Sequence, residues 1–325
     1  MTVSMTEVPT SSSVYYKDRY WNDHQLTIDY MSRLVTDLPT DKPRFWMAHV
    51  KSVYFAERPA RRALFINCGN GWAERDLYDL GVFESGIGYD YSHDLLKQAQ
   101  TAAGSRKLSY FRADCNALEL PENHFDLIVN VAAMHHVQFI NRMHEKLARA
   151  LTPDGYFINF DYVGPHRNQY SKEHFATMVQ INDTLPKSIQ NDHLVPPHLE
   201  TMLATDPTEA IHSELIMEMF ERFFIPVERK DLNGGIAYQI LHNNHELLTL
   251  DLPAAHAYLQ SLLEQDELYS LNKLVPTLFS FFVGRPRKSV LENSTALSLF
   301  TQDEMVREEY AKGHAGRYNY SLDVP

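Results

Sequence analysis

Hydrophobic residues in the first half of the chain form short β-rich runs that alternate with amphipathic, helix-like stretches. The runs lie at residues 63–67, 86–90, 108–113, 125–131 and 155–161. Between them, apolar positions follow helical spacing at residues 73–80, 93–103 and 139–150. Strands that alternate with helices are typical of βαβ units, so the pattern predicts an α/β core with a parallel sheet over residues 61–165.

The segments that flank this core carry other patterns. Residues 1–60 contain two helical stretches rich in aromatic side chains, which predict an N-terminal helical lid; an aromatic stripe that covers the core is the other interpretation. Residues 166–223 predict a helical insertion that caps an acceptor site. Residues 224–290 predict two late strands that complete the sheet, around a helical stretch at 254–271. The polar tail, residues 291–325, is expected to be peripheral.

Composition narrows the class of partner. The 325 residues are 44% hydrophobic and 22% charged, which suits a folded protein with a sizeable core. The net charge of -12 argues against nucleic acid or an anionic membrane as the main partner and favours a small-molecule substrate. The two cysteines show no metal or disulfide spacing, so we expect a cytoplasmic protein with no metal site. A homo-oligomer or a homologous partner subunit stays open.

The turn after the first predicted strand contains a Gly-x-Gly sequence, Gly69 and Gly71, directly before a helical stretch. Glycine lets the backbone approach a ligand closely, and a helix N-terminus offers N–H groups to it. A Gly-x-Gly sequence on its own could equally well be a turn that binds no ligand. The next two strands each end in an acid, Asp90 and Asp114. Either acid could be a helix cap, but the ordered set favours a nucleoside held where the carboxyl ends of parallel strands meet.

These segments look like the successive motifs of the class I, S-adenosylmethionine-dependent methyltransferases. The matching stretches are residues 63–71, 88–92, 113–114, 125–129 and 151–155, and they cover roughly the first half of the chain. Residues 161–165 and 206–211 are similar to segments of a bacterial, small-molecule methyltransferase-like subgroup. The resemblance implies a Rossmann-like, seven-stranded, mostly parallel sheet with an antiparallel final hairpin, and S-adenosyl-L-methionine as cofactor. It also implies that the cofactor contacts Asn67, Cys68, Gly69, Gly71, Asp90, Tyr91, Asp114, Cys115 and Asn130.

Two positions depart from the family pattern. The first strand usually carries an acid, followed two residues later by glycine, and here these places hold Phe65 and Asn67. Asparagine tolerates a left-handed backbone, so Asn67 is expected to preserve the turn. Phe65 removes a partner for the methionine end of the cofactor.

Candidate catalytic groups follow the fourth and fifth strands. His135 and His136 stand where the family presents its active-site face, and histidine is suited to accept a proton from an acceptor, with His136 preferred. Adjacent side chains diverge, so at most one ring is expected to face the methyl group; the alternative is a ring packed against the sheet. Tyr162 is a further catalytic candidate. The predicted acceptor contacts are Tyr20, Asp161 and His166.

Three functions are compatible with the sequence. The motifs favour methyl transfer to an oxygen or nitrogen of a small molecule, a class that includes sugars and secondary metabolites. The alternative, supported by Phe65 and Asn67, is a methyltransferase fold without activity that serves as a binding or regulatory partner. A nicotinamide-dependent oxidoreductase ranks lower because Glu74 occupies the place where that fingerprint requires a small residue.

Overall fold

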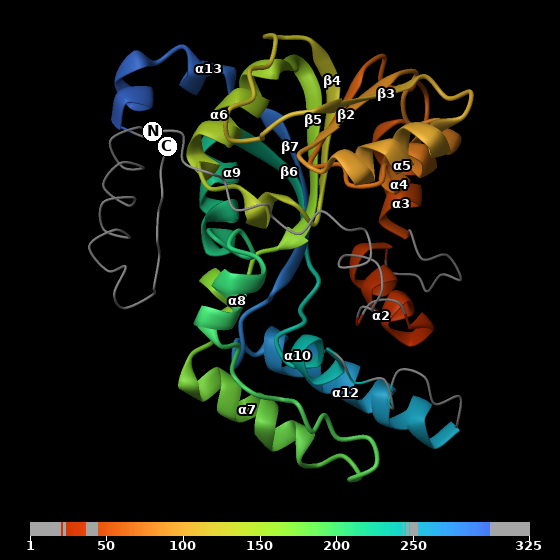
Figure 1. The fold of residues 1–325 in the computed structure, drawn as a ribbon, viewed down its shortest axis with the longest axis vertical. Helices are drawn as coiled ribbons and strands as arrows, with labels where there is room; N and C mark the ends of the chain where they lie inside the picture. The colour runs from red at the N-terminus through yellow and green to blue at the C-terminus, as the bar shows by residue number, and fades with distance from the viewer. Residues whose placement is uncertain are drawn as a thin grey trace.

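The computed structural model describes residues 21, 24–36, 45–242, 244, 247 and 253–299. At its centre is a seven-stranded sheet with the order β3-β2-β1-β4-β5-β7-β6 (Figure 1). The strands are β1 (Ala63–Ile66), β2 (Gly86–Asp90), β3 (Leu108–Arg112), β4 (Phe125–Val131), β5 (Leu151–Tyr162), β6 (Phe224–Asp231) and β7 (Phe279–Pro286). The first five strands pair in parallel, whereas β7 pairs antiparallel with both β5 and β6. The predicted sheet and its antiparallel final strands are confirmed.

Helices cover both faces of the sheet (Figure 1). One face carries α3 (Phe45–Tyr54), α4 (Trp72–Asp79) and α5 (His93–Ala103), and the other carries α6 (Ile140–Ala150), α9 (Ile216–Phe223) and α13 (Lys288–Leu291). Successive strand residues point to opposite faces, so Phe65 packs into the first core and Leu64 into the second. Both faces of the central strands are therefore apolar, as a doubly covered parallel sheet requires.

A second helical layer lies beyond one end of the sheet (Figure 1). It contains α7 (Lys172–Asn182), α8 (Leu199–Thr205), α10 (Ala237–Leu241) and α12 (Pro253–Leu271), with α2 (Gln25–Thr36) packed against α12. We call these five helices the cap. Strands β5 and β6 end at this edge and β7 begins there, so the cap is inserted at the carboxyl ends of the parallel strands. The predicted insertion, 166–223, supplies only part of the cap, and α9 within that range packs on α6 beside the sheet.

One buried carboxylate joins three parts of the cap. Asp266 of α12 is 0% exposed and accepts a hydrogen bond of 3.0 Å from the hydroxyl of Tyr30 in α2. It also accepts hydrogen bonds from the backbone N–H groups of Gly234, Ile236 and Ala237, at 2.8, 2.7 and 3.1 Å. These groups lie before and at the start of α10, so Asp266 stabilises the contact of α2, α10 and α12.

Two predicted element boundaries differ from the structure. Helix α6 ends at Ala150 as predicted, but β5 begins immediately afterwards at Leu151, not at Gly155. The register of β4 against β5 shifts there, because Phe125 pairs with Leu151 whereas Leu127 pairs with Tyr156. Pro153 and Gly155 thus lie within β5, where its pairing with β4 is irregular, and not in a turn before the strand. The end of the predicted helical insertion, 166–223, is divided into a 3-10 turn, η4 (Ser213–Leu215), and α9.

The N-terminal and C-terminal predictions fall partly outside the described residues. Helices α2 and α3 correspond to the two predicted N-terminal helices, while residues 1–20 and most of the predicted tail lie outside the described part. Within the described residues, no helix combines the length and the apolar character needed to cross a lipid bilayer.

Candidate functional site

The glycine turn after β1 adopts a left-handed backbone at three alternate positions. The φ angles are 46° at Asn67, 56° at Gly69 and 72° at Gly71. Asn67 therefore preserves the turn, as predicted from its tolerance of positive φ. Helix α4 starts directly after Gly71, so the N-terminal N–H groups of a helix lie beside the turn.

Gly71 is also required for packing. A Cβ atom at this position would lie 2.5 Å from the hydroxyl oxygen of Tyr110 and 3.0 Å from Cβ of Ala99. Tyr110 in β3 thus occupies the space that the absent side chain leaves. The missing side chain of Gly71 therefore makes room for Tyr110 and not for a ligand. Gly69 remains the position at which a ligand could contact the backbone closely.

Asp90, the acid at the end of β2, lies against this turn. Its Oδ2 accepts a hydrogen bond of 2.8 Å from the backbone N–H of Gly69, and its Oδ1 accepts one of 2.8 Å from that of Ser92. Burial raises the pKa of Asp90, while these two N–H groups counteract the rise. The neighbouring Tyr91 is half-buried, and the guanidinium of Arg112 lies 5.0 Å from the centre of its ring.

The end of β3 meets the same turn. Burial raises the pKa of the Cys115 thiol to about 12, Asp114 contributes to the rise, and a hydrogen bond with Asn67 counteracts it. Asp114 accepts from the backbone N–H of Asn116 at 2.9 Å, and the side-chain oxygen of Asn116 accepts from the backbone N–H of Gln138 at 3.2 Å. The predicted meeting of the β1, β2 and β3 ends at one edge is therefore present; their contact with a cofactor stays a prediction.

His135 and His136 form a 3-10 turn, η2 (Met134–His136), directly beyond β4. The Nδ1 atom of His135 lies 2.5 Å from Oδ1 of Asp161, whose carboxylate accepts only, so this nitrogen carries the proton. The Nδ1 atom of His136 lies 3.1 Å from the hydroxyl oxygen of Thr208, and that hydroxyl donates to Asp206 at 2.7 Å. Because the hydroxyl proton is already used, His136 Nδ1 is the donor. In each ring, Nε2 therefore points away from the side chain that is hydrogen-bonded to Nδ1.

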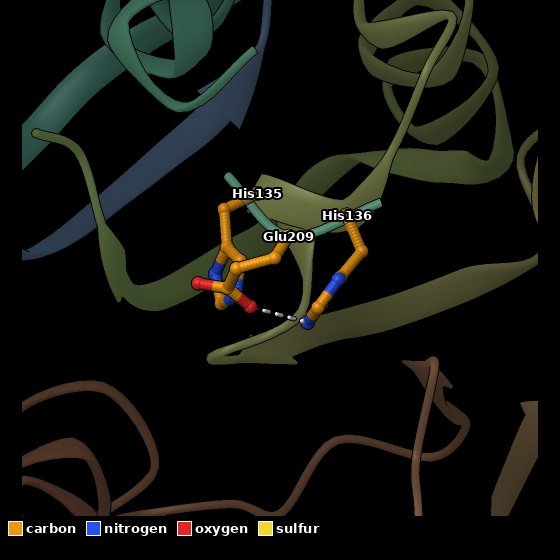
Figure 2. A group of neighbouring side chains, drawn as sticks. All are labelled: His135, His136 and Glu209. Carbon is orange, nitrogen blue, oxygen red and sulfur yellow. Dashed lines mark ion pairs between the residues drawn. The ribbon is translucent and has the colours of Figure 1, made fainter. Parts of the chain in front are cut away.

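Both Nε2 atoms approach a carboxylate from a distant part of the chain. Glu209 Oε2 lies 3.7 Å from Nε2 of His135 and 3.6 Å from Nε2 of His136 (Figure 2). The backbone N–H of Ile211 donates to the carbonyl of His135 at 2.9 Å, which ties the loop of Glu209 to the histidine pair. Sequence reasoning did not select Glu209; the signal was its place in the segment 206–211, which was noted only for its resemblance.

The electrostatics of this cluster are strongly coupled. Burial would lower the pKa of His135, but the carboxylates of Asp161 and Glu209 outweigh it and raise that pKa to about 10. Burial and the charge of His135 lower the pKa of His136. Burial would raise the pKa of Glu209, but the two histidines lower it to about 2. A neutral His136 retains a lone pair on Nε2, which can accept a proton or bind a cation.

The structure corrects one prediction for this site. The two imidazole rings were expected to diverge, yet their centres lie 4.2 Å apart and both Nε2 atoms approach Glu209. Asn130 and Asp161 are both 0% exposed, and Asn130 Nδ2 donates to Asp161 Oδ2 at 2.6 Å. They hold the histidine turn in place through these contacts, and the predicted cofactor contact of Asn130 and acceptor contact of Asp161 stay predictions.

The remaining candidates lie beside the cluster. Tyr162 is 4% exposed and its hydroxyl donates to the carbonyl of Pro165 at 3.3 Å, so its predicted catalytic role does not fit its burial. His166 is half-buried, and burial lowers its pKa to about 3. It lies 3.8 Å from Glu214 in a neighbouring group of side chains, and its predicted acceptor contact stays a prediction. Tyr20 falls outside the described residues.

Comparisons with known proteins agree with this geometry. Residues 64–159 match the methyltransferase domain family. A segment of 130 residues is 25% identical to the eEF1A lysine and N-terminal methyltransferase of Mus musculus, over 37% of this chain and 18% of that protein. A segment of 132 residues is 25% identical to the ubiquinone/menaquinone biosynthesis C-methyltransferase of Pseudomonas aeruginosa, over 41% of this chain and 50% of that protein. The match thus spans at most half of each relative.

A solved structure of an S-adenosylmethionine dependent methyltransferase from Mesorhizobium loti is similar with a TM-score of 0.45 and 17% identity, over 73% of this chain and 96% of that chain. The family match runs from β1 to β5. It includes the glycine turn, Asp90 at the end of β2 and Asp114 after β3. On this match, residues 64–159 carry a methyltransferase domain.

Proposed function

We propose that this protein transfers a methyl group from S-adenosylmethionine to an oxygen or nitrogen atom of a small-molecule acceptor. The observation that carries the proposal is the meeting of the glycine turn, Asp90 and the end of β3 at one edge of the sheet, beside the histidine pair. Carboxyl ends of parallel strands are where α/β folds bind their ligands.

In this proposal Asp90 has two tasks. It already fixes the turn through the N–H of Gly69, and its remaining lone pairs can accept hydrogen bonds from ribose hydroxyls. Asp114, at the next strand end, would receive the adenine amino group in this proposal. Phe65 is 2% exposed and packs against Phe83, with ring centres 5.4 Å apart, so the methionine end of the cofactor must be held by other groups.

The reaction is an in-line displacement at the sulfonium methyl carbon. The bond from sulfur to carbon breaks as the bond from acceptor oxygen or nitrogen to carbon forms, S-adenosylhomocysteine leaves, and the acceptor releases its proton. Alignment of the two reactants provides most of the acceleration. His135, His136 and Glu209 supply polar groups beyond the end of β4, where we expect an acceptor hydroxyl or amine to lie.

Two features support a small acceptor. The cap covers the carboxyl edge, which favours a substrate that fits beneath it over a large folded partner. The net charge of -12 disfavours polyanionic acceptors. The relatives include a lysine and N-terminal methyltransferase and a C-methyltransferase, so protein and carbon acceptors are the outcomes against which the proposal is tested.

A second candidate function is a binding partner that retains the fold without turnover, which Phe65 in place of an acid favours. Calorimetric titration with S-adenosylhomocysteine, followed by turnover of an acceptor panel, separates the two. We expect binding, and a loss of roughly 10- to 100-fold in affinity for Asp90→Asn, because one charged acceptor is lost. Asp154→Asn, at a side chain that is 96% exposed, is the matched control. No binding to the wild-type protein would refute the proposed function; binding without turnover would favour the second candidate.

A further inference from the structure

The histidine pair and Glu209 have the arrangement of a metal site. One ligand atom from each of the three residues lies within 4.8 Å of the other two. Figure 2 shows that the two rings and the carboxylate approach one another from two separate segments of the chain. We propose that Nε2 of His135, Nε2 of His136 and the carboxylate of Glu209 bind a divalent transition-metal ion. Adjacent histidines and a distant acid form no recognisable sequence spacing, so the sequence predicted no metal.

The supporting hydrogen bonds fix Nδ1 of each ring as the donor, so Nε2 is the nitrogen left to bind a metal once it carries no proton. Metal-bound histidines usually donate their second ring N–H to a carboxylate or another oxygen, which fixes the tautomer and the ring orientation. His135 donates Nδ1–H to Asp161, and His136 donates Nδ1–H to Thr208, which is itself bonded to Asp206. Each ring thus has an oxygen partner on one side and Glu209 on the other.

The separations fit a metal after a small adjustment. Nitrogen and oxygen ligands lie about 2.0–2.2 Å from ions such as zinc, which places them roughly 3.0–3.6 Å from one another. Glu209 Oε2 is 3.6 and 3.7 Å from the two Nε2 atoms. The side chain of Glu209 is 32% exposed and can rotate, whereas Asp161 at 0% exposure keeps His135 fixed.

The charges also suit a dication. Asp161 and Glu209 are two carboxylates in contact with one buried histidine, and Asp206 lies 3.9 Å from the other. These carboxylates favour positive charge at the two rings, and a metal ion would supply two positive charges at the point where the Nε2 atoms meet. Arg167 donates to the main-chain carbonyl of Glu209 at 3.1 Å.

The donor set selects the kind of ion. Two imidazoles and one carboxylate suit zinc, iron or a similar first-row ion, whereas magnesium prefers oxygen ligands alone. Three protein ligands leave at least one coordination position open. The catalytic use of that position rests on the proposed function: an acceptor hydroxyl bound there would lose its proton to solvent more readily and present its oxygen to the methyl group. The metal site itself rests on the geometry alone.

The test is metal binding to the full chain after treatment with EDTA and dialysis. Titration with ZnCl2 by calorimetry should show one ion bound with a Kd below about 1 μM, and Co2+ should give visible absorption bands that report coordination. Glu209→Gln should weaken zinc binding by roughly 100-fold or more, because even outer partners of metal ligands contribute about 10–100-fold. Asp161→Asn, which keeps all three ligands, should weaken it by roughly 10–100-fold.

Glu214→Gln is the matched control, because Glu214 belongs to a second group, His166, His212 and Glu214, with comparable separations. It should leave the affinity unchanged, and circular dichroism should show that each variant is folded. A wild-type Kd above about 0.1 mM, or zinc binding that Glu209→Gln leaves intact, would overturn the inference. Loss of binding in Glu214→Gln alone would assign the ion to the other group and would also overturn it. Binding of S-adenosylhomocysteine is measured separately, so failure here leaves the proposed function intact.

Discussion

The carboxyl group of Glu74 should make the stability of this protein fall as pH rises. Glu74 is in the first turn of α4, is 1% exposed, and lies so close to Gly88 that a Cβ there would be 2.8 Å from its Oε1. Burial raises the pKa of Glu74 from 4.5 to about 8, and Asp90 adds to the rise. The folded protein therefore holds a proton between these values that the unfolded chain releases.

The size of the change in the free energy of unfolding follows from the difference between the pKa values of Glu74 in the folded and unfolded states. Each unit of pKa difference corresponds to about 1.4 kcal/mol, so the full effect is roughly 4–5 kcal/mol. Because the pKa is raised in the folded state, the stabilisation is complete below about pH 4.5 and is lost as pH rises to about 8. Glu74→Gln has no proton to hold, so its free energy of unfolding should rise relative to the wild type by about 1.4 kcal/mol per pH unit across this window.

Urea denaturation of the two proteins from about pH 5 to about pH 9 measures this difference, and other titrating groups cancel in the comparison. The difference should reach roughly 3 kcal/mol at neutral pH and become constant above about pH 8. Glu84→Gln, at an exposed position, controls for the loss of one formal charge. A difference between wild type and Glu74→Gln that varies by less than about 1 kcal/mol over the whole range would refute the reasoning.

Further predictions concern the cap and the glycine turn. Asp266→Ala should lower the free energy of unfolding by about 3–5 kcal/mol, because four donors lose a buried acceptor; an unchanged urea midpoint would contradict this. Gly71→Ala should cost roughly 1–3 kcal/mol through its φ of 72° and its contact with Tyr110. In the Tyr110→Ala background, Gly71→Ala should lower the melting temperature less than it does in the wild type, because the steric contact is gone. An equal decrease in both backgrounds would show that the cost arises from the backbone conformation. Asn67→Gly should keep S-adenosylhomocysteine binding within a few-fold of wild type by calorimetry, since glycine also tolerates positive φ; loss of binding would show that the side chain is needed.

The central strands β1 and β4 could be predicted because they are buried on both faces and therefore appear as short apolar runs between helical patterns. The same logic found the glycine turn, since positive φ at Asn67 and Gly69 depends on local residue preferences. The start of β5 could not be found, because the proline and glycine in 152–155 indicate a turn while the observed pairing of Leu151 with Phe125 depends on the neighbouring strand.

The polar cluster was predicted less well, since its members meet through tertiary structure. Two polar residues of apolar strands were predicted to contact ligands, Asn130 from the family resemblance and Asp161 from its place at the end of the fifth strand. Their complete burial shows that they support the histidine turn. Glu209 reaches His135 only because the loop at 206–211 folds back onto η2, a contact that no local pattern encodes.

The place of β7 in the sheet has a consequence for how the chain is made. β7 lies between β5 and β6, although it is the last strand of the described residues. At a translation rate of about 5–20 residues per second, roughly 6–25 s pass between the synthesis of Tyr162 and that of Pro286. During this time the nascent sheet presents the unpaired backbone of β5 to its surroundings. Chaperone contact on the ribosome, or aggregation of chains that terminate before residue 279, would therefore concentrate on this one strand.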